Sequence, residues 1–205
     1  MTIRLHRSDL ADLSRYRGGA VAIDTEAMGL DLLRDRLCVV QVSPGDGSAD
    51  VIQIPAGPGA APNLTKLLAD ATVLKIFHFA RFDLAVLHKH LGIMAAPIYC
   101  TKIASRIART YSDKHGLKDL VRELLGIDLS KQQQLSDWGA ESLTDAQLAY
   151  AASDVLHLHA LKEKLDAILL REGRADLAAA CFRFLPDRVR LDLAGWAGED
   201  IFAHS

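Results

Sequence analysis

The sequence has no long uncharged apolar run. None of its apolar stretches approaches the roughly 18 residues that a membrane-spanning helix requires. Residues 1–7 contain two arginines and lack the apolar core of a secretion signal. We therefore expect a cytoplasmic protein with no membrane partner.

Cysteine is scarce. The three cysteines are odd in number, widely spaced and set in apolar surroundings: Cys38, Cys100 and Cys181. This pattern favours buried thiols in a reducing compartment over disulfides or a zinc site.

An excess of positive charge is also lacking. The net charge is −2 and the pI about 6.4, which argues against a protein that holds long nucleic acid through many phosphates. Between positions 102 and 131, however, seven basic residues stand against four acidic ones. A solvated helical face explains this excess equally well as a small electropositive patch suited to a short anionic substrate.

The chain is long enough for a full hydrophobic core. It has 205 residues, half of them hydrophobic, and no repeats, low-complexity tracts or charge blocks. The simplest organisation is one domain over residues 1–205. Within it, residues 186–205 form a C-terminal tail whose apolar residues pack on the domain or on a neighbouring subunit.

The pattern of strands and helices predicts the α/β class. We expect five strands, at 20–26, 36–43, 50–54, 73–78 and 96–99, the first three as an antiparallel meander. Predicted helices cover 8–16, 63–69 with Asn63 as cap, 82–91, 101–111, 117–125, 144–171 behind a capping box at 142–145, and 174–183 before the break at Pro186. This order indicates a mixed sheet flanked by helices, with an all-helical C-terminal half.

Two acidic residues end the first strand. Asp24 and Glu26 follow the apolar run of residues 20–23, and alternation places both on one face. Carboxylates so close together repel, and oxygen ligands favour a hard cation such as Mg²⁺ or Mn²⁺. The simpler interpretation is a strand end that runs into a solvated loop.

Three further residues extend this acidic pattern. Asp83 falls in the first turn of a predicted helix, where it also complements the helix dipole. Tyr150 and Asp154 share one face of an apolar helix. Buried polar groups need partners, so these two either bond to each other or belong to a site.

In order and spacing, Asp24-x-Glu26, Asp83 and Tyr150-x-x-x-Asp154 resemble the motifs of the DEDDy 3′-to-5′ exonucleases, in the ribonuclease D branch. The stretches 24–30, 75–79, 100–105, 131–134 and 200–205 are similar to compact bacterial oligoribonucleases of the nanoRNase C type. The resemblance implies a ribonuclease H-like fold and a single 3′-5′ exonuclease domain. The additional helical domains of ribonuclease D proper do not fit in this length, so we expect short RNA as substrate.

The resemblance also implies the chemistry. Two divalent cations, Mg²⁺ or Mn²⁺, would be held by Asp24, Glu26, Asp83 and Asp154, with Asp24 bridging both. Tyr150 would orient the attacking water, since an unperturbed tyrosine is too weak a base at neutral pH. The expected reaction releases nucleoside 5′-monophosphates from the 3′ end of short RNA, especially dinucleotides.

Substrate contacts are predicted less directly. Leu30 resembles the apolar wedge that related oligoribonucleases place between two bases, and a core leucine is the alternative. Further candidates for substrate binding are Thr25, Met28, His78, Arg81, Lys102, Ser105, Arg106, Lys131 and Gln134. Each of these also fits a surface or structural role.

Other functions remain open at this stage. A broader exonuclease on RNA or DNA ends, including tRNA 3′ trimming, uses the same residues. A non-catalytic nucleotide-binding scaffold is disfavoured because all four carboxylates and Tyr150 are present. The resemblance further implies a homo-oligomer, a ring of eight subunits, to which the apolar tail would contribute.

Overall fold

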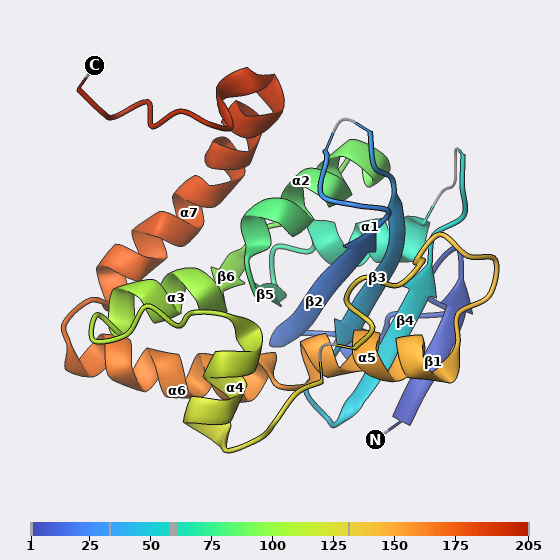
Figure 1. Cartoon of the computed structure of the whole chain (residues 1–205), viewed down its shortest axis with the longest axis horizontal. Helices are drawn as coiled ribbons and strands as arrows, with labels where there is room; N and C mark the ends of the chain where they lie inside the picture. The colour runs from blue at the N-terminus through green and yellow to red at the C-terminus, as the bar shows by residue number, and fades with distance from the viewer. Residues whose placement is uncertain (1, 33, 58–60, 131, 205) are drawn as a thin grey trace.

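The computed structural model describes residues 2–32, 34–57, 61–130 and 132–204. Its centre is a six-stranded sheet with the order β1-β4-β3-β2-β5-β6 (Figure 1). The strands are β1 (Thr2–Arg7), β2 (Ala20–Ala27), β3 (Leu37–Ser43), β4 (Ser48–Gln53), β5 (Leu74–Phe77) and β6 (Ile98–Cys100). The predicted mixed sheet is therefore confirmed, with one strand more than expected.

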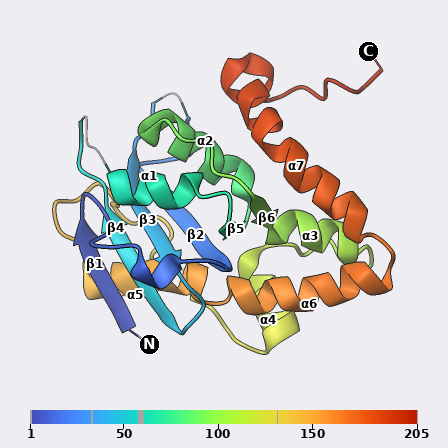
Figure 2. The ribbon, with the colours of Figure 1, turned by 180° about the vertical axis from the view of Figure 1, so that it is seen from behind.

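Helices cover both faces of the sheet (Figures 1 and 2). They are α1 (Pro62–Ala69), α2 (Ala80–Leu91), α3 (Thr101–Ala108), α4 (Leu117–Leu125), α5 (Asp145–Leu156), α6 (Leu158–Arg171) and α7 (Ala175–Leu191). One core joins α1 and α2 to the sheet face that carries Val21 and Ile23. The opposite face, which carries Ala22, packs against buried residues of α5 and α6. No helix in the described part of the chain is long and apolar enough to cross a membrane.

The meander of β2, β3 and β4 brings the first acidic pair to the centre of the sheet. Both of its strand pairs are antiparallel, as predicted, and Asp24 lies opposite Gln41. On its other side β2 pairs in parallel with β5, but only from Ala20 to Ala22. Residues 23–27 therefore extend beyond β5, and the start of α2 can approach them there.

The first strand was not predicted. Arg4, His6 and Arg7 obscure the apolar alternation of β1, which is an edge strand parallel to β4. Side chains also join β1 to β4: Arg4 Nη1 lies 3.6 Å from the buried Asp50 Oδ1, and His6 Nε2 hydrogen-bonds to the same oxygen at 2.8 Å. The helix predicted at 8–16 is wrong: only a 3₁₀ turn, Ser14–Tyr16, forms.

Three other boundaries differ from the prediction. Asp9, not Asn63, caps α1: its carboxylate accepts from the backbone N–H groups of Asn63 (2.8 Å) and Leu64 (2.9 Å). The helix predicted over 144–171 is two helices that meet at His157, which lets α6 pack on α3 as well as on β2 and β5.

The helix α7 also continues through Pro186 to Leu191. A proline inside a helix costs about 3 kcal/mol, whereas burying a leucine or valine side chain gains about 1.5–3 kcal/mol. Leu185 and Val189 on either side of Pro186 are both buried. Tertiary packing thus offsets the loss, and the predicted stop at Pro186 is wrong.

Candidate active site

Side chains from three elements meet in one cavity of about 500 Å³. Asp24 and Glu26 come from β2, Asp83 from the first turn of α2, and Tyr150 and Asp154 from α5. All five line the cavity. The structure therefore assembles every residue of the predicted acidic motif, although they are spread over 130 positions of the sequence.

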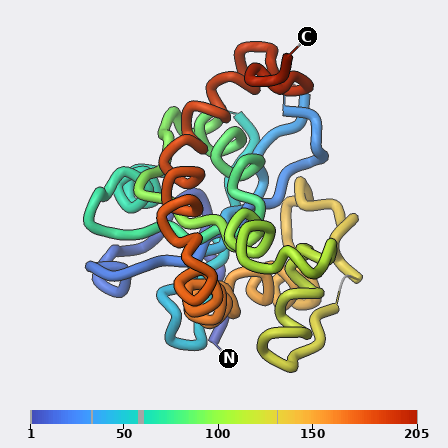
Figure 3. The backbone as a smooth tube through the Cα atoms, turned by 90° about the vertical axis from the view of Figure 1, so that its left-hand side faces the viewer, coloured from blue at the N-terminus to red at the C-terminus, as the bar shows by residue number. Residues whose placement is uncertain are grey.

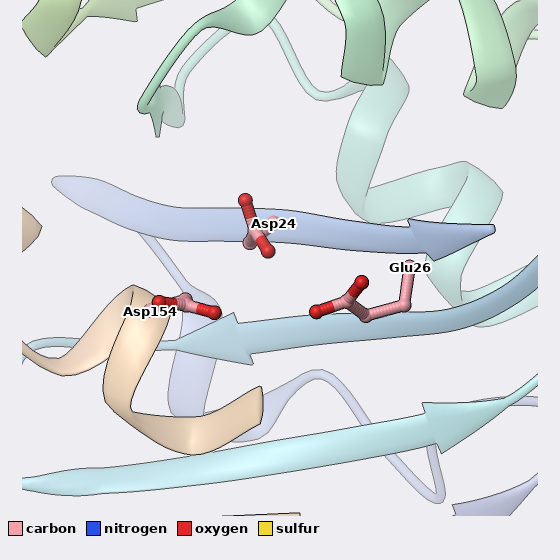
Figure 4. Close-up of side chains that lie close together, drawn as sticks. All are labelled: Asp24, Glu26 and Asp154. Carbon is pink, nitrogen blue, oxygen red and sulfur yellow. The ribbon is translucent and has the colours of Figure 1, made fainter. Parts of the chain in front are cut away.

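The carboxylates of Asp24, Glu26 and Asp154 form the centre of this site. Each offers an oxygen atom, and these atoms lie within 4.8 Å of one another. Figure 4 shows the three side chains directed into the same space between β2 and α5. Such a cluster is suited to a shared cation.

The position of α5 depends on its start and on its small residues. Thr144 is the N-cap and forms a capping box with Gln147, with the Gln147 backbone N–H donating to Thr144 Oγ1 at 3.2 Å. The capping box predicted at 142–145 is thus wrong in its residues: the box that forms lies two positions later. Ala151 and Ala152 are fully buried, so the helix approaches the sheet closely and places Tyr150 and Asp154 at its acidic edge.

Asp83 is held by a residue of the strand it approaches. The Thr25 hydroxyl donates to Asp83 Oδ1 at 2.7 Å, and both side chains are buried. Phe79, just before α2, adopts the left-handed conformation with φ of 67°. This sharp turn directs the start of α2 toward β2. Thr25 thus lines the cavity, but its hydroxyl orients Asp83.

Burial raises the pKa of all four acids, and the charges of neighbouring carboxylates raise it further for Asp24, Glu26 and Asp83. Burial is the largest cause in each case. It raises the pKa of Glu26 to about 9, with the charges of Asp154 and Asp83 adding to it. The pKa values of Asp83 and Asp154 rise to about 7. Asp24 has a pKa well above its usual range because it is buried among the other three carboxylates.

Tyr150 keeps its proton. Burial, followed by the charge of Asp154, raises the pKa of its hydroxyl far above the usual value. The hydroxyl hydrogen-bonds to the Asp154 carboxylate. Tyr150 therefore acts as a hydrogen-bond donor near neutral pH, not as a base.

The chemistry of these donors fits hard divalent cations. The ligands are carboxylate oxygens, which Mg²⁺ and Mn²⁺ prefer. Bringing four carboxylates together in a buried site is unfavourable unless they take up protons or a compensating cation. The raised pKa values express that cost, and a cation in the cluster would remove it.

Five of the predicted substrate-binding residues line the cavity: Thr25, Met28, Leu30, His78 and Gln134. Leu30 is 83% exposed and Met28 61% exposed, so the alternative of a core leucine is wrong. His78 Nδ1 lies 2.9 Å from Thr101 Oγ1. Burial, together with Lys102, lowers the pKa of the His78 ring, which is therefore neutral at physiological pH.

The other predicted substrate contacts are not brought into the cavity. The Arg81 guanidinium pairs with Asp192, with Nη2 to Oδ1 at 2.7 Å, and so holds the C-terminal segment. Ser105 is fully buried, and its hydroxyl bonds to Arg109 and His115. Arg106 is exposed on α3 outside the cavity. Lys131 lies outside the described residues.

Lys102 occupies an intermediate position. Its ammonium group lies 4.3 Å from the ring centre of Phe79, and that ring lines the cavity. Lys118 lies in the cavity wall and was counted only as part of the basic excess. Other wall residues were missed altogether, including Phe79, Phe82, Leu135, Ser136 and Trp138. For Phe79 and Phe82, the sequence signal was their closeness to His78, which was itself a predicted substrate contact.

A ribonuclease H-like sheet with four acids and a tyrosine in one cavity is typical of the 3′-5′ exonucleases. Sequence comparison assigns the chain to the same class. The chain belongs to the 3′-5′ exonuclease family, whose model matches residues 6–170. Ribonuclease D of Gluconacetobacter diazotrophicus is 38% identical over 167 residues, which cover 82% of this chain and 42% of that protein. The chain spans about two fifths of the length of such curated relatives.

A more particular likeness comes from solved structures. NrnC of Brucella melitensis with bound Mg²⁺ is 61% identical and superimposes with a TM-score of 0.96, covering 100% of both chains. NrnC of the same organism bound to pGG is 62% identical with a TM-score of 0.97, again over 100% of both chains. The resemblance to nanoRNase C stated from the motifs is thereby confirmed.

Proposed function

We propose that this protein is a metal-dependent 3′-to-5′ exoribonuclease that hydrolyses short RNA, especially dinucleotides, to nucleoside 5′-monophosphates. The observation that carries the proposal is the meeting of Asp24, Glu26, Asp83, Tyr150 and Asp154 in one cavity. Full-length similarity to NrnC, solved with Mg²⁺ and with pGG, supports both the cation and the class of substrate.

Asp24, Glu26 and Asp154 would hold one divalent cation, and Asp24 with Asp83 a second. When bound, two such ions supply activated water, neutralise phosphate charge and stabilise the leaving oxygen. Thr25 keeps the Asp83 carboxylate oriented toward the cavity. Tyr150 retains its proton, and its hydroxyl, which can donate one hydrogen bond and accept others, would orient the water that attacks the phosphate.

The shape of the cavity favours a small ligand. Its volume of about 500 Å³ lies within the roughly 300–1,000 Å³ of sites that enclose small molecules. The exposed Leu30 and Met28 provide apolar contact for bases at its wall. A closed end that receives a 5′ phosphate would exclude longer chains and explain a preference for dinucleotides.

The direct test follows mononucleotide release from 5′-labelled RNAs of two to seven residues. Wild type and Asp24→Ala are compared with Mg²⁺, with Mn²⁺ and with chelator. We expect metal-dependent cleavage that is fastest on the dinucleotide and absent in the variant. No cleavage by wild type at any length would leave a binding scaffold as the better account.

The same experiment separates the broader alternative. Rates indifferent to length, or equal on DNA of the same sequence, would indicate general processing of 3′ ends, including tRNA trimming. Equal rates on two-residue and seven-residue RNA would also remove the closed 5′ end. The curated ribonuclease D relatives are the reason to keep this comparison.

We further propose that the chain assembles into a ring of eight subunits. Trp196, Ile201 and Phe202 are 45%, 45% and 76% exposed, and several exposed large apolar side chains in one short segment favour burial against a partner. The first residues after α7 are fixed to their own domain, because Asp192 pairs with Arg81 and Leu193 packs on the core.

Light scattering tests the assembly. Replacing both Ile201 and Phe202 by serine is expected to lower the molar mass, whereas Tyr111→Ser, which alters an aromatic that is 68% exposed on another surface, should not. An unchanged mass in the double variant would exclude this part of the tail as the contact.

The free thiols of all three cysteines are compatible with the cytoplasm, where we propose the enzyme acts.

A further inference from the structure

The strand β3 contains one amide in an otherwise apolar sequence. Gln41 lies between Val40 and Val42 and is fully buried. Within the described part of the chain, neither its Nε2 nor its Oε1 atom has a hydrogen-bond partner. Leaving both polar atoms of a buried amide without a partner destabilises the fold. The position therefore calls for a polar partner that offsets this cost in the working protein.

Strand register identifies the neighbouring polar group. Gln41 lies directly opposite Asp24 in the antiparallel pair of β2 and β3. Opposite residues share a face, with Cβ atoms about 4.5–5.5 Å apart, which is within reach of a glutamine side chain. On its other side Gln41 lies opposite Val51 of β4, whose side chain offers no hydrogen bond.

The helix above this face offers no alternative among its buried apolar residues. α5 packs on β3, and its buried Ala151, Ala152 and Val155 have no polar side-chain atoms. Asp154 of the same helix belongs to the carboxylate cluster, but Asp24 is the acid that the strand register places directly opposite Gln41.

We infer that Gln41 is a positioning residue: its Nε2, which is unpartnered in this structure, turns to donate to the opposite Asp24 carboxylate when the divalent cation is bound, and so holds that carboxylate in the orientation that binds the cation. This inference rests on the proposed metal-dependent function. A hydrogen bond to the ionised carboxylate favours that form. Partners behind metal ligands fix ligand orientation, and their loss typically costs about 10- to 100-fold in metal affinity.

A purely structural role predicts a different result. If Gln41 only fills space, methionine, which is similar in length and apolar, removes the unpaired amide without changing the cation site. Stability would then stay the same or rise, and metal affinity would not change. Metal affinity measured without nucleotide therefore separates the two roles.

The experiment measures Mn²⁺ binding to the full chain by isothermal titration calorimetry, for wild type, Gln41→Met and Gln53→Met. Gln53 is a matched control: it is a glutamine of β4, one strand further from Asp24, and its Nε2 donates to the Ala140 carbonyl at 2.7 Å. We expect the Gln41→Met dissociation constant to rise about tenfold or more and that of Gln53→Met to stay at the wild-type value.

An unchanged dissociation constant in folded Gln41→Met would overturn the inference. If that variant does not fold, Gln41→Asn serves instead, since it keeps an amide but withdraws it by one methylene. The same rise is expected there, and unchanged affinity would again refute it. If wild type binds Mn²⁺ more tightly than Gln41→Met but cleaves no RNA, the proposed function would fail while this inference stands.

Discussion

Asp24 experiences the charge of every other acid in the cavity. Asp83, Asp154 and Glu26 all raise its pKa, in addition to burial. The four carboxylates therefore repel one another when ionised, and the folded site is stable only if they take up protons or bind cations. This conflict makes stability of the metal-free protein a direct measure of how the acids interact.

The pH dependence of that stability follows from the sign of the shifts. Glu26 has a pKa near 9 when folded and 4.5 as its ordinary value, so the folded state holds the proton more tightly. Its contribution is greatest at low pH and declines as pH rises from about 4 toward 9. Each pH unit in that interval is worth about 1.4 kcal/mol at most for one group.

We therefore expect Glu26→Gln, with chelator present, to be more stable than wild type by several kcal/mol at pH 8.5. The gain should be much smaller at pH 5.5, where wild type is protonated at this position. Urea unfolding at both pH values measures it. Glu163→Gln, an exposed acid of α6, serves as control. A gain independent of pH would contradict the assigned shift.

Metal addition gives a second prediction at this scale. Saturating Mg²⁺ is expected to raise the melting temperature of wild type at pH 7.5, because only the folded state presents the cluster. Asp24→Asn should start from a higher metal-free value and show little further rise. An equal Mg²⁺-induced rise in the two proteins would show that Asp24 is not a ligand.

Tyr150 supports a third prediction. Tyr150→Phe removes the hydroxyl that bonds to Asp154 but leaves the acids in place. We expect kcat on a dinucleotide to fall by roughly 100-fold, the scale of misorienting a reactant, with Mn²⁺ affinity within a few-fold of wild type. Parallel loss of both would instead make Tyr150 part of the cation site.

At the scale of elements, the segment between β2 and β3 carries the exposed Leu30. Asp35 folds back inside it, accepting from the Asp31 backbone N–H at 3.0 Å and from Arg34 Nε at 2.7 Å. A Cβ atom on Gly29 would lie 2.2 Å from Asp35 Oδ2. The absence of a side chain at Gly29 thus allows the compact turn that presents Leu30.

Gly29→Ala should displace this turn and lower kcat/KM on a dinucleotide by roughly 10- to 100-fold. Leu30→Ala should lower kcat/KM by a similar factor, because it removes the side chain that would contact a base. Gly198→Ala is the control, because a Cβ there meets nothing within 4 Å. Steady-state kinetics test both variants. Wild-type kinetics in Leu30→Ala would remove the wedge role.

Elements were predictable where local pattern and packing agree. The strand at 20–27 and the helix with Tyr150 and Asp154 follow from alternation and from residues spaced by four. β1 was not predictable, since its polar residues Arg4 and His6 are accounted for only by their contacts with Asp50, which lies on another strand. The same applies to the cap of α1, because Asp9 lies 54 positions from Asn63 in the chain.

At the scale of the whole molecule, the C-terminus lies at the opposite end from the N-terminus (Figure 3). The segment after α7 is joined to α2 by the pair of Arg81 and Asp192, whose side chains are 111 positions apart. Arg188 also contacts Asp192, with Nη2 to Oδ1 at 3.0 Å. This charged contact fixes the start of the apolar tail.

Arg81→Met is therefore expected to lower the free energy of unfolding by about 1.5–3 kcal/mol, the range for hydrogen bonds to a charged group. Dinucleotide KM should remain within a few-fold of wild type. Urea unfolding and steady-state kinetics test the two parts. A large rise in KM with unchanged stability would restore the predicted substrate-binding role of Arg81.

The sequence by itself determined the identity of the chemistry. Two acids that end a buried strand, an acid at a helix start, and a tyrosine and an acid on one helical face are local patterns. Each is ambiguous alone, but their order and spacing along the chain can be read without knowing the fold. For that reason the acidic motif, the mixed sheet and the family were all accessible before the fold was known.

Tertiary structure alone decided which polar groups share a partner. Arg81 and Ser105 resemble substrate ligands in the sequence, yet Asp192 and Arg109 engage them in the fold. Gln41 looks like an ordinary strand residue until register places it beside Asp24. Such pairings depend on contacts between residues far apart in the chain, which local spacing does not encode.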